Sequence, residues 1–549
     1  MTAIAAPNQR WVFGPIPDLL LGCGLGYVLL ISLLPLLPVD AQMLVTLGTF
    51  GTLLIGAPHY GATLLRVYAS PVDRRKYAFF AIYLSAMVWL WFGVGLYDLG
   101  VGSAMITLYL TWSPFHYTGQ NYGLAVMFLR RREVAFSERT KKLLYASFML
   151  SFVLVFVSLH RALGGAGAAN YGIGNFAGTP FHFIQLGLPV GFWKLAFVVV
   201  GAAYIGVTLA TIRALLRSAR FADLVPVVAL MIAQALWFSL PELWIWMTKT
   251  TLQTQGVGWL FVWAVLGHSA QYLWITTYYA VGREGGIRRW RYLFATLGAG
   301  SAIWTIPALV FSPLVFGTHP YNMGLFLMIA AAVNLHHFIL DGAIWKLRDS
   351  GVGAILLAQP SAEHVSALGP APHRPWIAAG GWTTAALLTA LSFYGMAERI
   401  NWTSSVNRSD GERAIRSAER LRWIGRADPH LDMFDGLVAL RAGELDASLA
   451  AYQESLDLYP TPEAYFALAV VHMSRSETAL AERALRNCLE MDPEHGKAHR
   501  LLGRQLSSRG EFEAGLHHLT MAARLMPADS AVKNELEAVR ASQGRPKAP

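Results

Sequence analysis

Five histidines and one aspartate are the residues of this sequence with the clearest capacity for chemistry. They are His59 in "GAPHYGA", His116 in "SPFHYTGQNYG", His268 in "VLGHSAQYLW", and His336, His337 and Asp341 in "NLHHFILDGAIWK". Neutral imidazole is a common ligand of zinc, copper and iron, and a carboxylate can either join it or orient it. Because the surrounding residues are mostly apolar, the pattern favours a metal site inside a helical bundle.

The last of these stretches indicates which side chains share one face of a helix. His337 and Asp341 are four residues apart, and Asn334 comes three residues before His337, so the three side chains follow one side. His336 points about 100° away from His337, and the two rings cannot both aim at one centre. We therefore predict that His337 is a ligand, that Asp341 ligates or orients the ring, and that His336 is a second candidate beside the site.

Five further polar side chains could fix the imidazole rings by hydrogen bonds. The alternative interpretation of the histidines is a structural polar network or a proton path. The predicted supporting residues are Gln120, Asn121, Gln271, Tyr272 and Asn334. The histidines as a set predict iron or another transition metal. Haem is the alternative cofactor, because two histidines on facing helices can supply both of its axial ligands.

The elements that would position these residues are long apolar helices. The chain has 549 residues, of which 54% are hydrophobic and only 14% are charged, a balance typical of a membrane protein. A bilayer core of about 30 Å needs about 20 mostly apolar residues per helix. We predict about eleven such segments, at residues 17–37, 43–67, 77–97, 101–129, 142–159, 191–212, 224–246, 257–281, 291–316, 322–345 and 376–395.

The distribution of cations predicts how these helices are oriented. Lys and Arg gather in alternate connections, near residues 74–76, 130–142, 213–220, 283–291 and 346–349, which should therefore be cytoplasmic. The N-terminus is then cytoplasmic, and the C-terminal part lies outside a plasma membrane, in the periplasm for a bacterial inner membrane. This pattern explains the formal net charge of +10 without a nucleic-acid partner. In this orientation the histidines share one layer, about 18 to 25 Å along helices of one direction.

The composition changes near residue 397, and the remaining chain is predicted to be a soluble helical domain. Pro429, Pro460, Pro493 and Pro527 are spaced 31, 33 and 34 residues apart, and the intervening sequence resembles tetratricopeptide repeats. We predict a transmembrane domain at 1–397 and a repeat domain at 398–549, with repeats near 429–460, 462–493 and 496–527. The resemblance implies a protein or peptide partner; a passive cap on the membrane domain is the alternative.

Three stretches of the membrane region resemble a known enzyme family. "GAPHYGA", "SPFHYTGQ" and "GHSAQY" are similar to three histidine patches of the microbial membrane β-carotene 15,15′-dioxygenases. The resemblance implies a polytopic helical enzyme that holds iron through His59, His116 and His268. The chain departs from the family at Thr63 and Leu64, where the family has an aspartate and a histidine, and at Tyr272, where it has a histidine. His336, His337 and Asp341 would restore the ligand count.

Three functions are compatible with these patterns. The first is an all-α polytopic membrane protein that acts as a metal-dependent oxygenase on a lipophilic substrate, in contact with membrane lipid. The second is a haem-binding electron carrier. The third is a non-enzymatic scaffold for assembly or transport, which captures a partner with its repeats.

Overall fold

The structure is a computed structural model that describes residues 10–33, 48, 50–69, 71–160, 181–240, 259–284, 288–347, 350–357 and 375–543. The regular secondary structure of these residues is helical. The chain divides into two units. Unit 1 comprises Met1–Val310 and Gly324–Met396, and unit 2 comprises Phe311–Met323 and Ala397–Pro549.

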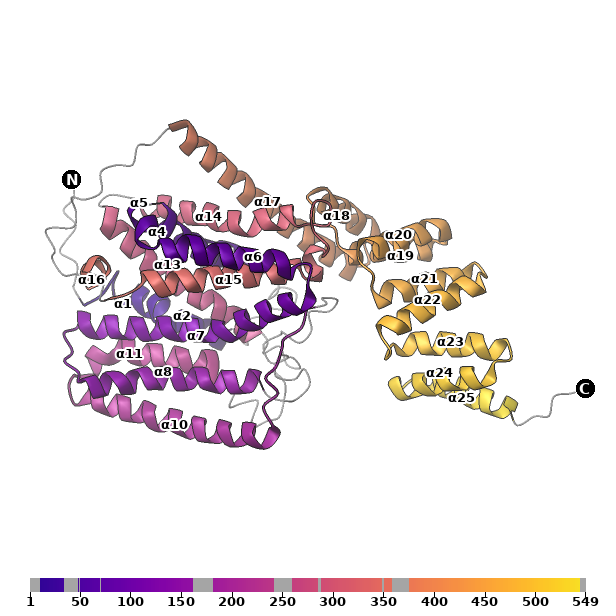
Figure 1. The fold of residues 1–549 in the computed structure, drawn as a ribbon, viewed down its shortest axis with the longest axis horizontal. Coiled ribbons are helices and arrows are strands. Elements are labelled where there is room, and N and C mark those ends of the chain that lie inside the picture. Colours follow the sequence, from indigo (N-terminus) through magenta and orange to yellow (C-terminus); the bar gives the residue numbers. More distant parts are fainter. Residues whose placement is uncertain are drawn as a thin grey trace, which may run out of the picture. The chain divides into compact units, whose positions relative to one another are not determined.

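Unit 1 is a bundle of helices that run roughly side by side (Figure 1). Its longer helices are α2 (Leu25–Leu33), α4 (Ala57–Tyr68), α6 (Ser85–Gly95), α7 (Leu99–Arg131), α8 (Glu138–Leu159), α10 (Val190–Leu216), α11 (Phe221–Gln234), α13 (Trp259–Glu284), α14 (Arg289–Val310) and α15 (Leu325–Ile344). The shorter helices are α1 (Pro15–Pro17), α5 (Pro71–Lys76) and α16 (Ser350–Leu356), and four π-helical segments are η1 (Asp18–Gly22), η3 (Thr52–Gly56), η4 (Phe79–Leu84) and η5 (Ala235–Ser239). The long helix α17 (Pro375–Asn407) begins in unit 1 and ends in unit 2.

Five helices of the described ranges are long and apolar enough to cross a membrane. They are Glu138–Leu159, Gly191–Leu216, Phe221–Ser239, Arg289–Val310 and Leu325–Ile344. Each of the five overlaps a predicted segment. The predicted number of about eleven is too high, because the other predicted segments do not form described helices that are both long enough and apolar enough. The all-helical prediction is confirmed, and the finer helix count is not.

The remaining predicted segments fall short for different reasons. The helix α4 has 12 residues, and the apolar helix Phe79–Gly95 is also shorter than the five. The helix α7 is long, with 33 residues, but polar side chains such as Gln120 and Asn121 interrupt its apolar sequence. Residues 34–47, where the first predicted segment ends and the second begins, lie outside the described residues.

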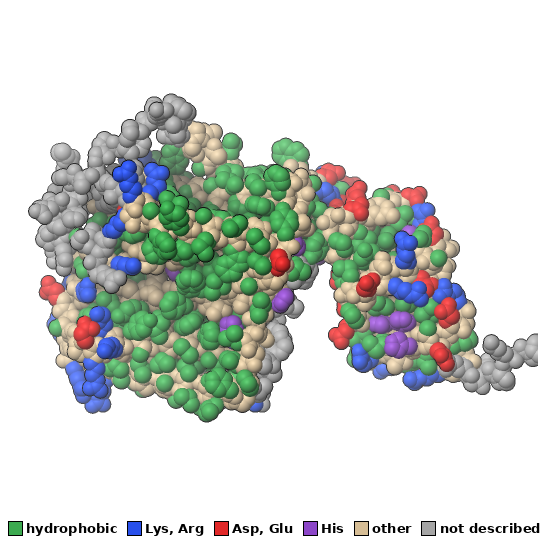
Figure 2. All heavy atoms as spheres, viewed as in Figure 1, with side chains coloured by type: hydrophobic (Ala, Val, Ile, Leu, Met, Phe, Trp, Pro, Cys, Tyr) green, Lys and Arg blue, Asp and Glu red, His purple; other side chains and the backbone are tan. Residues whose placement is uncertain are grey.

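The helix α10 shows most directly that unit 1 needs an apolar surrounding. Only 17% of its most apolar stretch is buried inside the protein. Its Leu195, Val199 and Leu209 are 66%, 57% and 62% exposed. Figure 2 shows hydrophobic side chains over most of this face of the unit, with Lys and Arg gathered at one end. A soluble protein rarely exposes an apolar surface of this extent, whereas lipid would cover it.

The helix α15, which carries His337, lies at the centre of unit 1. Of its most apolar stretch 83% is buried, and it packs against α4, α6, α7 and α14. Small residues bring α4 against α14, because a Cβ added at Gly61 would lie 1.8 Å from the Thr296 carbonyl oxygen, and one at Gly300 would lie 1.8 Å from that of Ala57. Such backbone contact is typical of helix pairs in membranes. It fixes α4, and therefore His59, within the bundle.

Unit 2 consists of short helices joined by tight turns. They are α18 (Gly411–Trp423), α19 (Pro429–Ala442), α20 (Leu445–Leu458), α21 (Pro462–Ser474), α22 (Thr478–Met491), α23 (Gly496–Ser508), α24 (Phe512–Leu525) and α25 (Ser530–Gln543). The helices α19 to α24 pack as three successive pairs (Figure 1). Small residues permit this pairing, since a Cβ at Gly503 would lie 2.8 Å from Leu519 and one at Gly436 would lie 2.6 Å from Tyr452. Because helix pairs occur in several repeat classes, the tetratricopeptide assignment stays a prediction.

The segment Phe311–Met323 joins α14 to α15 but belongs to unit 2. Asn322 donates a hydrogen bond of 2.6 Å from its amide to a carboxylate oxygen of Asp428, and the Arg426 guanidinium lies 4.7 Å from the centre of the Tyr321 ring. Asp428 is fully buried and also pairs with Arg399 at 3.0 Å. The segment that leads into α15 is thus part of the same compact unit as the helix pairs.

Candidate metal centre

Four of the five predicted histidines converge inside unit 1. His59 lies on α4, His116 on α7, His268 on α13 and His337 on α15, and one ring nitrogen from each lies within 4.8 Å of the other three. The rings follow one another around a closed circle. Their centroids are separated by 4.2 Å (His59 to His337), 4.9 Å (His337 to His116), 5.1 Å (His116 to His268) and 5.0 Å (His268 to His59). The convergence predicted from the sequence is confirmed. We call these four residues the histidine cluster.

Six of the eight ring nitrogens of this cluster are buried without a hydrogen-bond partner among the described residues. Both ring nitrogens of His59 and of His268 are buried without a partner, and so is Nε2 of His116 and of His337. His59, His268 and His337 are each at most 1% exposed. Buried polar atoms are nearly always satisfied, and several unpartnered nitrogens around one point are the arrangement expected of a metal site.

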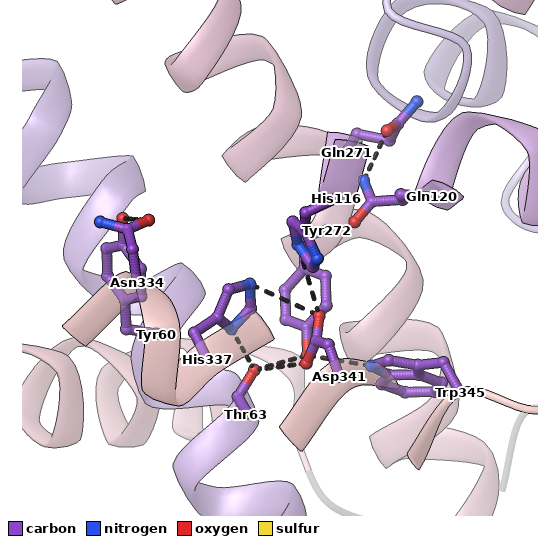
Figure 3. A network of polar contacts seen from close by, with 10 residues as sticks. All are labelled: Tyr60, Thr63, His116, Gln120, Gln271, Tyr272, Asn334, His337, Asp341 and Trp345. Carbon is purple, nitrogen blue, oxygen red and sulfur yellow. Dashed lines mark hydrogen bonds and ion pairs between the residues drawn. The ribbon is translucent and has the colours of Figure 1, made fainter. Parts of the chain in front are cut away.

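The hydroxyl of Thr63 sets the orientation of His337. Its Oγ1 lies 2.9 Å from His337 Nδ1 and donates a hydrogen bond of 2.9 Å to Asp341 Oδ1. Because this hydroxyl has one proton, which goes to the carboxylate, it accepts from His337 Nδ1. The lone pair of His337 is then on Nε2, the nitrogen that lies 3.4 Å from Asp341 Oδ2 (Figure 3).

The carboxylate of Asp341 faces the histidine cluster with one oxygen and is held by the other. Its Oδ1 accepts hydrogen bonds from Thr63 and, at 2.6 Å, from the Tyr272 hydroxyl, which in turn accepts from Trp345 Nε1 at 3.0 Å. Its Oδ2 lies 3.4 Å from Nε2 of His337 and 3.9 Å from Nε2 of His116. The geometry therefore suits Asp341 both as a fifth ligand and as the group that orients its neighbours (Figure 3).

The spacing of the cluster can be compared with that of a bound ion. Ring nitrogens at the usual distance of about 2.1 Å from a metal lie about 3.4 Å apart in a tetrahedron. The observed limit of 4.8 Å is longer by somewhat more than 1 Å, so small side-chain rotations would close the site. The donor set of four neutral imidazoles and one carboxylate suits iron, zinc or copper.

His336 lies apart from the cluster. Its Nε2 is 3.1 Å from the Tyr68 hydroxyl, and its ring stacks on that of Tyr68 with the centroids 6.2 Å apart. The structure thus separates the two adjacent histidines as the helical geometry predicts, with His337 turned to the cluster and His336 turned to Tyr68.

The predicted supporting residues divide into two groups. Tyr272 binds Asp341, and Asn334 accepts a hydrogen bond of 2.9 Å from Tyr60, whose ring lies 5.4 Å from that of His337. Gln120, Asn121 and Gln271 instead bond to one another and to Gln234, and no hydrogen bond to a ring of the cluster is present among the described residues. They form a polar network that joins α7, α11 and α13, a role that buried amides commonly have between membrane helices.

Three contributors were absent from the sequence-based set. They are Thr63, which donates a hydrogen bond to Asp341, Tyr60, which donates to Asn334, and Trp345, which donates to Tyr272. A signal for Thr63 was present, because it follows His59 by four residues and so shares its face of α4. Trp345 follows Asp341 by four residues in the same way. Tyr60 gave no such signal.

A groove runs past the cluster between α7, α13 and α15. Its volume is about 330 Å³, and it is lined by Trp112, Phe115, His116, Gly119, Gln120, Gly123, Leu124, Met127, Tyr272, Ile275, Phe338, Asp341, Gly342, Trp345, Leu347 and Leu356. From Trp112 to Met127 it follows α7 for about 22 Å. Its polar lining includes His116 of the histidine cluster together with Asp341, Gln120 and Tyr272, and most of the others are apolar or aromatic.

Three glycines keep this groove open. A Cβ added at Gly119, Gly123 or Gly342 would meet no other atom within 4 Å. Larger side chains at these positions would therefore project into the free space of the groove. The space beside His116 and Asp341 thus depends on glycine at two positions of α7 and one of α15.

Comparisons with known proteins add no further assignment. No protein-family model matches the chain, and no curated protein matches it significantly. The function has to be argued from the histidine cluster and the groove beside it.

Proposed function

We propose that this chain is an integral membrane protein that binds a transition-metal ion, iron in the first instance, at His59, His116, His268 and His337. We further propose that it oxidises a lipophilic substrate there, with dioxygen as the oxidant. The observation that carries the proposal is the convergence of buried, unpartnered imidazole nitrogens from four helices. A redox-active metal ion at this position would supply the activation of dioxygen.

The side chains around the cluster support this assignment by what each can do. Thr63 holds His337 with Nε2 free, and Tyr272 holds Asp341 with Oδ2 free, so both potential ligand atoms are oriented before any ion binds. The groove offers an apolar substrate a route past His116 and Asp341. Its aromatic walls, including Trp112 and Phe338, exclude water from that route.

The haem alternative fits the geometry less well. A porphyrin supplies four nitrogens itself and leaves two axial positions, so it would use only two of the four histidines. The centroids of neighbouring rings are 4.2 to 5.1 Å apart around the circle, which leaves no width for a planar macrocycle between them. A single ion uses all four.

The repeat domain is proposed to bind a protein or peptide partner outside the cytoplasm. The support is the series of helix pairs in unit 2 and the inclusion of Phe311–Met323. This connection has no Lys or Arg, so the alternating cation pattern predicts that it is external. The non-enzymatic scaffold remains the second candidate function. It keeps this partner but predicts no metal.

Metal analysis of the purified protein separates these functions. We expect about one iron ion per chain in the wild-type protein, and its loss in His116→Ala and in His337→Ala. His336→Ala is the matched control, because this adjacent histidine is also buried but bonds to Tyr68. A wild-type protein without metal, or an equal loss in the control, would leave only the scaffold. A visible Soret band would instead identify the haem carrier.

The groove gives a separate test of the substrate. In Gly119→Leu and Gly123→Leu the new side chain enters the groove and leaves all four histidines in place. Metal content should therefore persist, while oxygen uptake with a total lipid extract falls at least tenfold. Gly206→Leu on α10 is the control, since a Cβ there also meets nothing within 4 Å but the position lies outside the groove. Unchanged oxygen uptake in both groove variants would refute the assigned route.

A further inference from the structure

A second pocket lies entirely within unit 2 and differs in chemistry from the groove. It occupies about 360 Å³ between the end of α17 and α18, and it is lined by Asn401, Ser404, Ser405, Arg408, Asp410, Arg413, Arg416, Ser417 and Arg420. Four of these nine residues are arginines, and one is acidic. The proposed metal site does not involve this pocket.

The arginines of this pocket are only partly neutralised. Arg416 pairs with Glu412 at 3.3 Å, and Arg420 pairs with Glu398 at 3.0 Å. The guanidinium groups of Arg408 and Arg413 make no ion pair with a carboxylate of the described residues. Two guanidinium groups therefore remain available for a ligand, and the other two have one carboxylate each.

The acidic member of the lining is occupied by the backbone. The Asp410 carboxylate accepts a hydrogen bond of 3.1 Å from the amide of Arg413 and caps the N-terminus of α18. Its own amide donates to the Ser405 carbonyl at 2.9 Å, which closes the turn between α17 and α18. Asp410 thus has a structural role, and the rim keeps its excess of arginine.

The floor of the pocket is small and polar. Ser405 and Ser417 are 5% and 3% exposed, whereas the four arginines are exposed. Small hydroxyl-bearing residues below a ring of guanidinium groups leave room for a compact ligand with several acceptor oxygens. Arginine is preferred for such ligands because its planar fork can donate two parallel hydrogen bonds to a phosphate.

We propose that this pocket binds a phosphate-type anion through Arg408 and Arg413, with Arg416 and Arg420 completing the rim. A free phosphate ester and the headgroup of an anionic phospholipid share this chemistry. The position in the chain is compatible with a headgroup, because Asn401 follows Met396, the last residue of unit 1, by about 8 Å along α17.

The test uses the full-length protein in a neutral detergent and two probes. Inorganic pyrophosphate represents the free anion. Short-chain phosphatidylglycerol represents the lipid, with phosphatidylcholine of the same chain length as the neutral reference. The variant is Arg408→Gln with Arg413→Gln, and the control is Arg441→Gln with Arg483→Gln, which removes two exposed arginines outside the pocket.

We expect the wild-type protein and the control to bind at least one probe. The pocket variant should bind it about tenfold or more weakly, since it loses two guanidinium groups that can donate charge-assisted hydrogen bonds. Binding of pyrophosphate alone would identify a free phosphate. Binding of phosphatidylglycerol alone would identify a lipid site. No binding of either probe, or equal weakening in the control variant, would overturn the proposal; matching circular dichroism melts show that all variants fold.

Discussion

The hydroxyl of Thr63 offers the sharpest test of the proposed metal site, because it bonds to His337, Asp341 and Tyr272 without being a ligand. Thr63→Val keeps the shape of the side chain and removes the oxygen. Asp341 Oδ1 keeps its hydrogen bond from Tyr272, whereas His337 Nδ1 loses its acceptor. The ring of His337 is then free to rotate or to present the wrong nitrogen.

The size of the effect follows from this loss. Removing a hydrogen-bond partner of a metal-binding histidine usually lowers metal affinity by 10- to 100-fold, which corresponds to about 1.4–2.7 kcal/mol. The fold should be less affected, because Thr63 and valine have similar shapes and the site retains the Tyr272 to Asp341 contact. We therefore expect weaker binding with a nearly unchanged thermal unfolding temperature of the metal-free protein.

A chelator-competition titration with Zn²⁺, a redox-inert ion, measures this affinity in detergent. Thr211→Val is the matched control, since Thr211 is also buried and donates only to the Val207 carbonyl of its own helix at 2.7 Å. An affinity of Thr63→Val equal to that of the wild type would refute the orienting role. An equal decrease in the control would attribute the loss to general destabilisation.

Three other predictions address the rest of the chain. A reporter active only outside the cytoplasm, fused after residue 549, should be active, and an inactive fusion would contradict the predicted orientation. Burial and the neighbouring His499 lower the pKa of His518 to about 4, from an ordinary value of 6.5. As the pH falls, the unfolded chain therefore binds the proton before the folded chain does. The helices α23 and α24 should lose stability between pH 6.5 and pH 4, as measured by hydrogen exchange, and His518→Gln should make their stability less dependent on pH. Gly503→Ala should lower the free energy of unfolding of unit 2 by about 1–3 kcal/mol in denaturant titrations, because the added Cβ would lie 2.8 Å from Leu519. An unchanged free energy of unfolding would show that α23 and α24 can move apart to accept the methyl group.

Helical periodicity was sufficient to predict the face of α15 that carries His337 and Asp341. The four-residue spacing of His337 and Asp341 and the 100° offset of His336 follow from the geometry of any helix, and the structure shows both. The common depth of the histidines followed in the same way from position along the helices. What the spacing could not supply was the rotation of one helix against another.

That rotation explains the differences at the supporting residues. Gln120 follows His116 by four residues, which places both near one face of α7, yet its amide meets Gln271 of α13 and no histidine. Thr63 was treated as a departure from a resembling family, and its contact with His337 depends on how α4 lies against α15. Among the described residues, the number of helices long and apolar enough to span a membrane was overestimated, because apolar composition alone does not fix where a helix begins, ends or is interrupted.

The energetic cost of the histidine cluster argues that it evolved around a ligand. Six ring nitrogens of its four histidines are buried without a partner among the described residues. Each unsatisfied polar atom costs about 1–3 kcal/mol, so the six together cost an amount similar to the whole stability of a typical protein, about 5–15 kcal/mol. Apolar residues at these positions would avoid the cost entirely. A metal ion satisfies one nitrogen of every histidine at once, and this recovers most of what the arrangement would otherwise lose.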